Sequence, residues 1–432
     1  MSKKTKIYGS VLLIAFLFIN TYFFQDSIRL SLKSLLPDNA KIYVKELFFG
    51  KQFLKEVSYF KNSNYNQKIL PATEFVGINF KKITLKDLDV LEQTHYAKIN
   101  NKKSNTKTFY LDKIKNDLIL ATVKGNIFIF KEGELKNKTK ISNNLNKLNA
   151  THLMDIAIIK DYIYVSFREE PENSKCSYFH LVKAKFNKEH LKFENFFSPK
   201  RCTINNYGGR ISSGKFNNKD GIILTTGATG NEERHFAQDP NSHLGKILFF
   251  SFDEKDFKII SKGHRNPQGL FVENEIILAT EHGPYGGDEI NHIKQNGNYG
   301  WPISSYGEGY KFYNKTYNKK IFEYKKSHEN NDFIEPIFTF VPSIGISEII
   351  KIPNKFSKYW QNNYFITSLA GVSLYRVEFD KSYTKVKYLE KIIALERIRD
   401  IAYLDFNNTF YLALETTGQL GLLSNEHESS IK

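Results

Sequence analysis

The chain repeats one local pattern that few folds can accommodate, in which three short apolar runs are joined to one another by turns. Runs of this length that are rich in β-branched and aromatic residues are typical of strands, and aromatic residues make up 15% of the chain. Six such groups follow one another at a spacing of roughly 40–60 residues. The runs of the six groups are, in order, Phe109–Leu111, Asp117–Val123 and Ile127–Phe130; Leu153–Ile159, Tyr162–Phe167 and Tyr178–Phe186; Arg210–Phe216, Gly221–Thr226 and Lys246–Phe252; Gly269–Glu273, Glu275–Thr280 and Glu289–Ile293; Ser347–Ile352, Tyr364–Ser368 and Ser373–Phe379; and Ile398–Leu404, Thr409–Glu415 and Gln419–Ser424.

Successive antiparallel meanders of this kind are typical of propeller blades. A large β-sandwich is the alternative, but sandwiches connect their strands by Greek-key crossings instead of repeated meanders. With 432 residues the chain is long enough to bury a large core. We therefore expect an all-β fold, a six-bladed β-propeller over residues 76–425, preceded by an N-terminal transmembrane anchor.

The expected anchor is an apolar run, Ile7–Phe24, that follows three lysines among the first six residues. A helix of that length rises about 27 Å, close to the thickness of a hydrocarbon core. The pattern predicts a membrane anchor in residues 1–25 and a juxtamembrane stem in residues 26–75. Positive charge before the run would keep the N-terminus in the cytoplasm and export the propeller to the periplasm or the cell exterior. A cleaved signal peptide is the alternative, but the run ends in bulky residues where a cleavage site needs small ones.

The net charge of +16 does not by itself indicate a nucleic-acid partner. Only nine of the 62 basic residues are arginines, and the lysines are spread along the chain without a nucleic-acid-binding motif. We expect no nucleic-acid binding.

The two cysteines, Cys176 and Cys202, could form a disulfide in an exported protein, although their spacing alone leaves this open. Their spacing gives no zinc site.

One region carries too many special residues for a plain loop, and it consists of the segments Gly263–Leu270, Thr280–Asn291 and Gly297–Pro302. His, Arg, Asn and Gln stand together just before one expected strand, and Glu, His, Asp and Glu follow the next strand among several glycines. Glycines allow the backbone to approach a ligand closely. Carbonyl and carboxylate oxygens in such a loop suit a hard cation such as Ca²⁺.

The order GHRNPQGL, EHGPYGGDEIN and GNYGWP resembles the glucose/sorbosone dehydrogenases that depend on pyrroloquinoline quinone (PQQ). Three shorter segments are also similar to that family, and the likeness is continuous from about residue 150 to 425. These segments are Gly208-Gly209-Arg210, Ala237–Ile247 and Arg397-Ile398-Arg399-Asp400. Four of the nine arginines lie in these motifs, Arg210, Arg265, Arg397 and Arg399. Guanidinium groups pair bidentately with carboxylates, of which PQQ has three.

The resemblance implies that PQQ lies over the central channel, that Ca²⁺ polarises its quinone, and that a histidine accepts a proton from the sugar hydroxyl. It implies cofactor contacts at Asn266, Arg397 and Arg399, and a metal held by the main-chain carbonyls of Gly283 and Pro284. Three further residues are added to these assignments. Arg210 is a further candidate for cofactor binding, and Asp288 and Glu289 are candidates for shaping the metal loop. The implied partners are a sugar or another small-molecule ligand and a separate electron acceptor.

Three positions depart from the family pattern. The catalytic histidine falls at Asn206, and asparagine cannot accept a proton at neutral pH. A cofactor-contacting glutamine falls at Ala150, and a cofactor-contacting lysine falls at Ala370. The histidines considered as substitute bases are His152, His235 and His243.

Two functions follow from this combination of likeness and departure. The first is a PQQ-dependent sugar dehydrogenase. The second is a catalytically inactive propeller that binds a carbohydrate or another ligand on the same face, because fold alone does not decide function.

Overall fold

The structure is a computed structural model that describes residues 78–85, 92–99, 102–136, 138–171, 174, 176–204, 208–230, 233–253, 256–308, 324–325 and 327–425. All of them belong to one compact unit, Phe75–Lys432. The expected anchor Ile7–Phe24, the stem 26–75 and Asn206 lie outside the described residues. Within the described part of the chain, no helix is long and apolar enough to cross a membrane.

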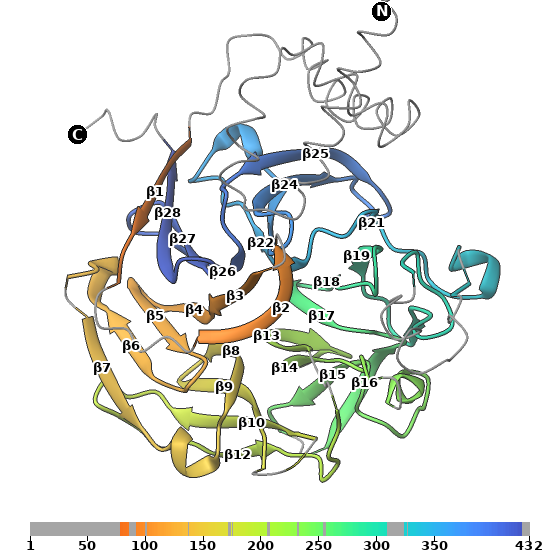
Figure 1. Cartoon of the computed structure of the whole chain (residues 1–432), viewed down its shortest axis with the longest axis horizontal. Helices are drawn as coiled ribbons and strands as arrows, with labels where there is room; N and C mark the ends of the chain where they lie inside the picture. The colour runs from red at the N-terminus through yellow and green to blue at the C-terminus, as the bar shows by residue number, and fades with distance from the viewer. Residues whose placement is uncertain are drawn as a thin grey trace, which may run out of the picture. The chain divides into compact units, whose positions relative to one another are not determined.

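Six antiparallel sheets surround a common centre as the blades of a propeller (Figure 1). The first three blades contain β4 (Phe109–Ile114), β5 (Asp117–Thr122), β6 (Ile127–Phe130) and β7 (Lys138–Asn143), with β11 (His190–Leu191) added in parallel; β8 (His152–Ile159), β9 (Tyr162–Glu169), β10 (Tyr178–Lys185) and β12 (Glu194–Phe197); and β13 (Gly208–Phe216), β14 (Lys219–Thr226), β15 (Lys246–Ser251) and β16 (Phe257–Lys262), with β20 (Gly297–Asn298) added in parallel. The last three contain β17 (Pro267–Glu273), β18 (Ile276–Glu281), β19 (Asp288–His292) and β21 (Phe338–Phe340); β22 (Ile346–Lys351), β23 (Asn363–Ser368), β24 (Ser373–Phe379) and β25 (Val386–Ile393); and β26 (Ile398–Leu404), β27 (Thr409–Leu414), β28 (Gln419–Asn425) and β1 (Ile78–Ile83).

The remaining elements are short. β2 (Glu92–Ile99) and β3 (Lys102–Lys107) pair with each other as a separate two-stranded sheet before the first blade. The described helices are all single 3₁₀ turns, namely η1 (Lys131–Gly133), η2 (Leu145–Leu148), η3 (Arg234–Ala237), η4 (Glu329–Asn331) and η5 (Lys358–Trp360). The expected all-β class and the six blades are therefore confirmed.

A separate hydrophobic core fills the space between each pair of neighbouring blades, and the sixth core lies between the last blade and the first. Successive side chains of a strand point to opposite faces of its sheet. In β14, Ile222 and Leu224 accordingly pack toward the second blade, whereas Ile223 packs toward the fourth. Both faces of such a strand are buried, which explains why the centre of β14 is continuously apolar in the sequence.

The ring is closed by strands from both ends of the propeller. β1 pairs antiparallel with β28, with Ile78 opposite Asn425 and Ile83 opposite Leu420, so the last blade takes its outermost strand from the N-terminal side. This pairing joins the two ends of the ring by hydrogen bonds.

The outermost strands were not predicted from the sequence, although all six groups of inner strands were. β25 alternates between exposed and half-buried residues, and β21 has only three residues. Such strands lack the continuous apolar pattern that comes from burial on both faces.

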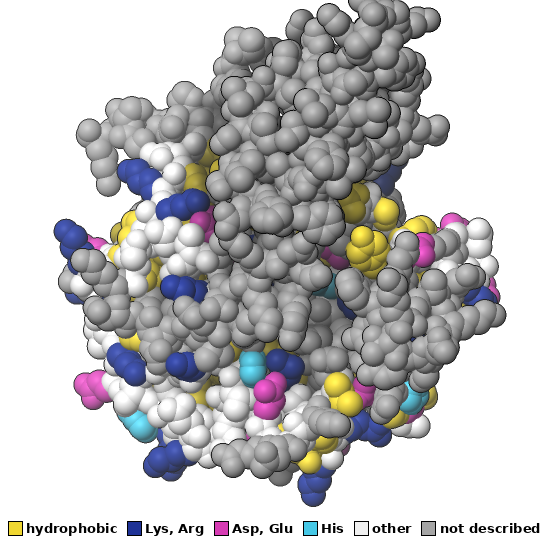
Figure 2. All heavy atoms as spheres, viewed as in Figure 1, with side chains coloured by type: hydrophobic (Ala, Val, Ile, Leu, Met, Phe, Trp, Pro, Cys, Tyr) yellow, Lys and Arg dark blue, Asp and Glu magenta, His cyan; other side chains and the backbone are white. Residues whose placement is uncertain are grey.

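The two cysteines form a disulfide, with a distance of 5.4 Å between their Cα atoms. Beside it, Ser177 and Thr203 form an isolated antiparallel bridge. Lysine and arginine side chains of the described residues are scattered among acidic and apolar ones on the face drawn in Figure 2, where they form no single basic patch.

Candidate active site

Three of the predicted site residues, Asn266, Gly283 and Arg397, lie at the end of the propeller where the innermost strands begin. In each antiparallel blade, the start of the innermost strand lies beside the end of the second strand. Pro267 is thus opposite Glu281, Gly208 is opposite Thr226, and Ile398 is opposite Leu414. The loops that carry Asn266, Gly283 and Arg397 therefore open on the same face of the propeller.

Arg397 and Arg399 share one carboxylate, that of Glu415, which follows β27 and is completely buried. The Nε of Arg397 donates to Oε2 of Glu415 at 2.9 Å, and Nε and Nη2 of Arg399 donate to Oε1 at 3.0 and 2.7 Å. Burial on its own would raise the pKa of Glu415, but Arg399, Arg397 and a hydrogen bond from Thr108 lower it to about 2. Glu415 is therefore ionised at neutral pH and neutralises one of the two guanidinium charges.

The amide of Asn266 is oriented by its neighbours. Its Oδ1 accepts hydrogen bonds from the backbone N–H of Gly208 at 3.1 Å and from Nε2 of Gln268 at 3.0 Å. Its Nδ2 has no hydrogen-bond partner among the described residues, and this donor suits a ligand. Gln268 in turn accepts from Nη1 of Arg399 at 3.0 Å through Oε1, so one chain of hydrogen bonds joins Asn266 to Arg399.

The segment around Asn266 is held by a second buried carboxylate, that of Glu281. One oxygen accepts from the backbone N–H groups of Arg265 and Asn266, and the other lies 3.0 Å from Nδ1 of His264. Glu281 is the last residue of β18. A single side chain thus fixes three consecutive residues of the motif against the neighbouring strand.

Asp288 holds the loop that was predicted to bind a metal. Oδ1 of Asp288 accepts from the N–H of Gly283 at 3.1 Å, and Oδ2 accepts from the N–H groups of Ile344 and Ile346 at 3.0 and 2.9 Å. No hydrogen bond to the carbonyl of Gly283 occurs among the described residues. That carbonyl is thus available to a cation, which is the role predicted for it together with the carbonyl of Pro284.

Glu289 lines a small hollow together with Gly283 and His328. Its Oε2 accepts from Nδ2 of Asn291 at 3.2 Å, and its Oε1 lies 3.6 Å from Nε2 of His328. Burial, together with the nearby Glu281, raises the pKa of Glu289 well above its ordinary value. Within the described residues, no group of three or more His, Cys, Asp or Glu side chains forms a metal-binding cluster, so a metal here would depend largely on main-chain oxygen.

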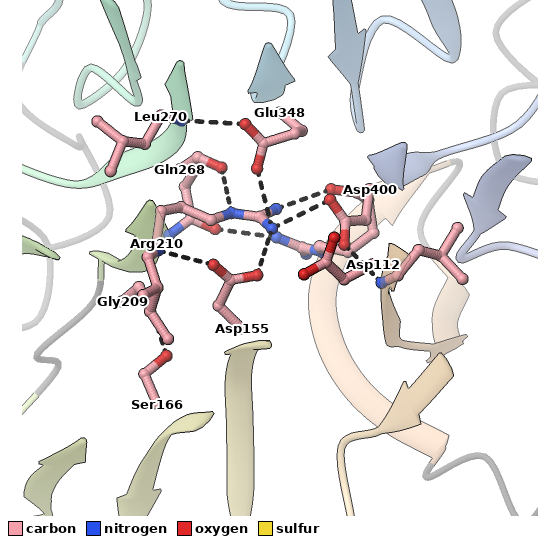
Figure 3. Close-up of polar contacts among 12 residues, drawn as sticks. Asp112, Asp155, Ser166, Gly209, Arg210, Gln268, Leu270, Glu348 and Asp400 are labelled. Carbon is pink, nitrogen blue, oxygen red and sulfur yellow. Dashed lines mark hydrogen bonds and ion pairs between the residues drawn. The ribbon is translucent and has the colours of Figure 1, made fainter. Parts of the chain in front are cut away.

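Arg210 lies at the centre of the ring and contacts three carboxylates from three innermost strands (Figure 3). Its Nη1 lies 3.0 Å from Asp155 and from Glu348 and 3.1 Å from Asp400. Its Nε and Nη2 donate to the backbone carbonyls of Gln268 and Arg399 at 2.7 and 3.0 Å. The guanidinium is only 2% exposed, so protein groups occupy the donors that would have to reach a cofactor. The cofactor role of Arg210 stays a prediction.

The same carboxylates tie the innermost strands to one another. Asp155 accepts from the N–H of Ile211 at 2.8 Å, Glu348 from that of Leu270 at 3.0 Å, and Asp400 from that of Leu111 at 2.7 Å. Burial raises the pKa of all three carboxyl groups, that of Glu348 to about 7, although Arg210 opposes the rise.

The three histidines considered as substitute bases lie in different surroundings. His152 has Nδ1 3.3 Å from Glu170, and burial and Arg168 lower its pKa. His243 is buried beside Phe197, and burial lowers its pKa to about 4. His235 is exposed on η3.

The segment that contains Asn206 is bounded by two anchored residues. The N–H of Ile204 donates to Oε1 of Glu233 at 2.7 Å, and the N–H of Gly208 donates to Asn266. The disulfide holds Cys202 just before it. Asn206 is thus separated by one residue from a backbone group that contacts a predicted cofactor residue.

Sequence reasoning missed Glu415 as a residue of this site, whereas Gln268 and Glu281 stood in the motif without an assigned role. The signal for Glu415 was an acidic residue directly after the apolar run 410–414 of β27. Of the two family positions occupied by alanine, Ala150 is buried and Ala370 is exposed, and neither side chain can donate a hydrogen bond to a ligand.

Comparisons with known proteins identify relatives of the chain. A model of the "Glucose / Sorbosone dehydrogenase" family matches residues 107–422. The chain is 29% identical over 239 residues to the aldose sugar dehydrogenase YliI of Escherichia coli, covering 51% of this chain and 61% of that protein. It is 26% identical over 241 residues to the quinoprotein glucose dehydrogenase B of Acinetobacter calcoaceticus, covering 42% of this chain and 50% of that protein. The matches thus span about half to three-fifths of the length of these relatives.

A solved structure shares the fold. The PQQ-bound form of the aldose sugar dehydrogenase of Streptomyces coelicolor superimposes with a TM-score of 0.58 at 19% sequence identity, over 82% of this chain and 99% of that one. At this identity the likeness concerns the fold alone.

Proposed function

Because the chain belongs to the glucose/sorbosone dehydrogenase family, we propose that it is a quinoprotein-type aldose dehydrogenase that oxidises a sugar hydroxyl with PQQ and Ca²⁺. The observation that carries the proposal is the set of preformed donors at the channel mouth. Arg397 keeps Nη1 and Nη2 without a hydrogen-bond partner among the described residues, and Asn266 keeps Nδ2. These donors suit the carboxylates and carbonyls of PQQ.

The residues would divide the work as follows. Arg397 and Arg399 would bind a carboxylate of the cofactor, and Asn266 would donate to one of its oxygens. The carbonyls of Gly283 and Pro284 would hold Ca²⁺ beside the quinone, with Asp288 fixing the loop that presents them. Bound PQQ would supply the two-electron oxidant, since the protein's side chains have no such chemistry.

We expect PQQ binding to require Ca²⁺. The purified chain should develop the absorbance of bound PQQ when both are added, and its melting temperature should rise because the ligands bind only the folded state. A chelator should reverse both changes. If neither the absorbance nor the melting temperature responds, the dehydrogenase proposal fails.

A second function is supported by three positions at which the chain departs from the family pattern. Asn206, Ala150 and Ala370 replace a base and two cofactor contacts expected from the resemblance. A catalytically inactive propeller that binds a carbohydrate or another ligand on this face would keep the fold and lose exactly such groups. Sugar binding in the absence of PQQ, seen by calorimetry, would favour this function.

We also propose that residues 1–25 anchor the protein in a membrane, that 26–75 form a stem, and that 76–425 are exported. The disulfide supports the last point, because disulfides persist in oxidising compartments. In intact cells, Cys176 and Cys202 should resist a thiol-reactive label until a reductant is added. Labelling of both cysteines without reductant would place the propeller in a reducing compartment.

A further inference from the structure

We propose that Glu415 is a positioning residue that sets Arg397 and Arg399 for the carboxylates of a bound ligand, an inference that rests on the proposed function. Glu415 follows the second strand of the last blade, so it lies beside the start of the innermost strand β26, which Arg397 precedes and on which Arg399 lies. Neither the family motif nor the predicted site includes it.

Glu415 is itself fixed from three sides. Thr108, just before β4, donates from Oγ1 to Oε1 of Glu415 at 2.6 Å. The backbone N–H of Glu415 donates to the carbonyl of Arg397 at 2.7 Å, and its carbonyl accepts from the N–H of Lys107 at 2.7 Å. The carboxylate therefore cannot move without disturbing the junction between the last blade and the first.

The carboxylate occupies one edge of each guanidinium group. Oε2 receives Nε of Arg397, and Oε1 receives both Nε and Nη2 of Arg399. Nη1 of Arg399 donates to Gln268, and Gln268 also orients Asn266. One hydrogen-bond network therefore includes Asn266, Arg397 and Arg399, the three predicted cofactor contacts. The outer edge of Arg397 remains available to a ligand, in a direction that Glu415 determines.

The balance of charge distinguishes this cluster from the one at the propeller axis. At the axis, three carboxylates surround the single guanidinium of Arg210, whose donors are taken up by protein groups. Around Glu415, one carboxylate serves two guanidinium groups and leaves an excess positive charge. If the cluster served only to join the blades, it would not need Arg397, which donates to Glu415 through Nε alone.

The test uses the full chain and titrates PQQ in the presence of Ca²⁺. Glu415→Ala should raise the dissociation constant for PQQ at least tenfold, whereas Glu415→Asp should restore most of the affinity. Acetate has the size and charge of the group removed by Glu415→Ala, so it should tighten PQQ binding to this variant and not to the wild type. Glu390→Ala is the matched control, because Glu390 pairs with Nε of Arg376 at 2.7 Å in another blade; its affinity for PQQ should not change.

A second readout does not depend on PQQ. With only nine arginines in the chain, the Nε–H signals in a nitrogen-15 NMR spectrum can be resolved individually. Those of Arg397 and Arg399 should be protected from exchange in the wild type and lost in Glu415→Ala, while that of Arg210 persists. If the wild type does not bind PQQ but both signals behave in this way, the proposed function fails and the positioning role stands. Unchanged signals, or unchanged PQQ affinity in a folded Glu415→Ala, would overturn the positioning role.

Discussion

Replacement of Arg210 by methionine is expected to lower the free energy of unfolding at pH 7 by about 3–5 kcal/mol. Methionine fills a similar volume but leaves Asp155, Glu348 and Asp400 without their shared cation in a buried place. It also removes the hydrogen bonds from Arg210 to the carbonyls of Gln268 and Arg399. Urea unfolding, followed by fluorescence, measures the loss.

The loss should depend on pH in a defined direction. Burial raises the pKa of Glu348 from 4.5 to about 7, so its contribution to stability is complete below about pH 4.5 and disappears as the pH rises through 7. Without Arg210 the three carboxyl groups become still harder to ionise. The deficit of Arg210→Met should therefore be smaller at pH 5 than at pH 8.

Two further variants make this prediction decisive. Arg376→Met removes a guanidinium whose partner Glu390 is 36% exposed, and it should cost less and vary little with pH. If Arg210→Met does not fold, Glu348→Gln tests the same idea, because removing one of three buried carboxylates should improve stability at pH 8 relative to pH 5. Equal deficits at both pH values would show that Arg210 does not act by compensating these charges.

The propeller could be predicted from the sequence because burial on both faces of an inner strand leaves a pattern within that single strand. An inner strand such as β14 is buried on both faces, so it must be apolar at every central position. The outermost strands face solvent on one side and are held by pairing with their neighbours. Their pattern depends on the rest of the blade and is not specific in the sequence, and for that reason β1 and β25 were missed.

The sequence indicated the segments that concentrate unusual residues, but it did not indicate which side chains in them pair with one another. Asn266, Gly283 and Arg397 come together on one face through hairpin pairing, which the strand order alone implies. Arg399 and Glu415 come from neighbouring strands of one blade, whereas Arg399 and Gln268, which are 131 residues apart, join two blades. No local sequence pattern predicts a contact between side chains so far apart in the chain.

For Arg210, the sequence indicated an important residue but not its partners. Its position among the motifs suggested a ligand contact, yet its surroundings consist of three carboxylates and two carbonyls supplied by other strands. A rare arginine in a lysine-rich chain indicates that a guanidinium is needed. Whether the partner is a cofactor or the protein itself depends on which charges the fold brings to it.

Replacement of Asn206 by histidine is expected to increase sugar oxidation by about 10²-fold or more, because a general base contributes about 10²–10⁴-fold to a rate. The wild type should correspondingly be slow even when PQQ and Ca²⁺ are bound, since asparagine cannot accept the proton of the sugar hydroxyl. Asn206 lies outside the described residues, but Gly208, two residues on, donates its N–H to Asn266. A side chain at position 206 is thus tied to the predicted cofactor contacts by a short length of chain.

The rate is measured with an aldose, PQQ, Ca²⁺ and an artificial electron acceptor. In Asn206→His it should rise with pH as the imidazole loses its proton, around the ordinary histidine pKa of about 6.5, while the affinity for PQQ stays that of the wild type. Asn205→His is the matched control, because it adds the same group one residue away and should give little gain. A fast wild-type enzyme would mean that another residue, such as His152, already serves as the base. No gain in Asn206→His with PQQ bound would mean that the contacts missing at Ala150 and Ala370 limit the reaction, or that the propeller binds its ligand without oxidising it.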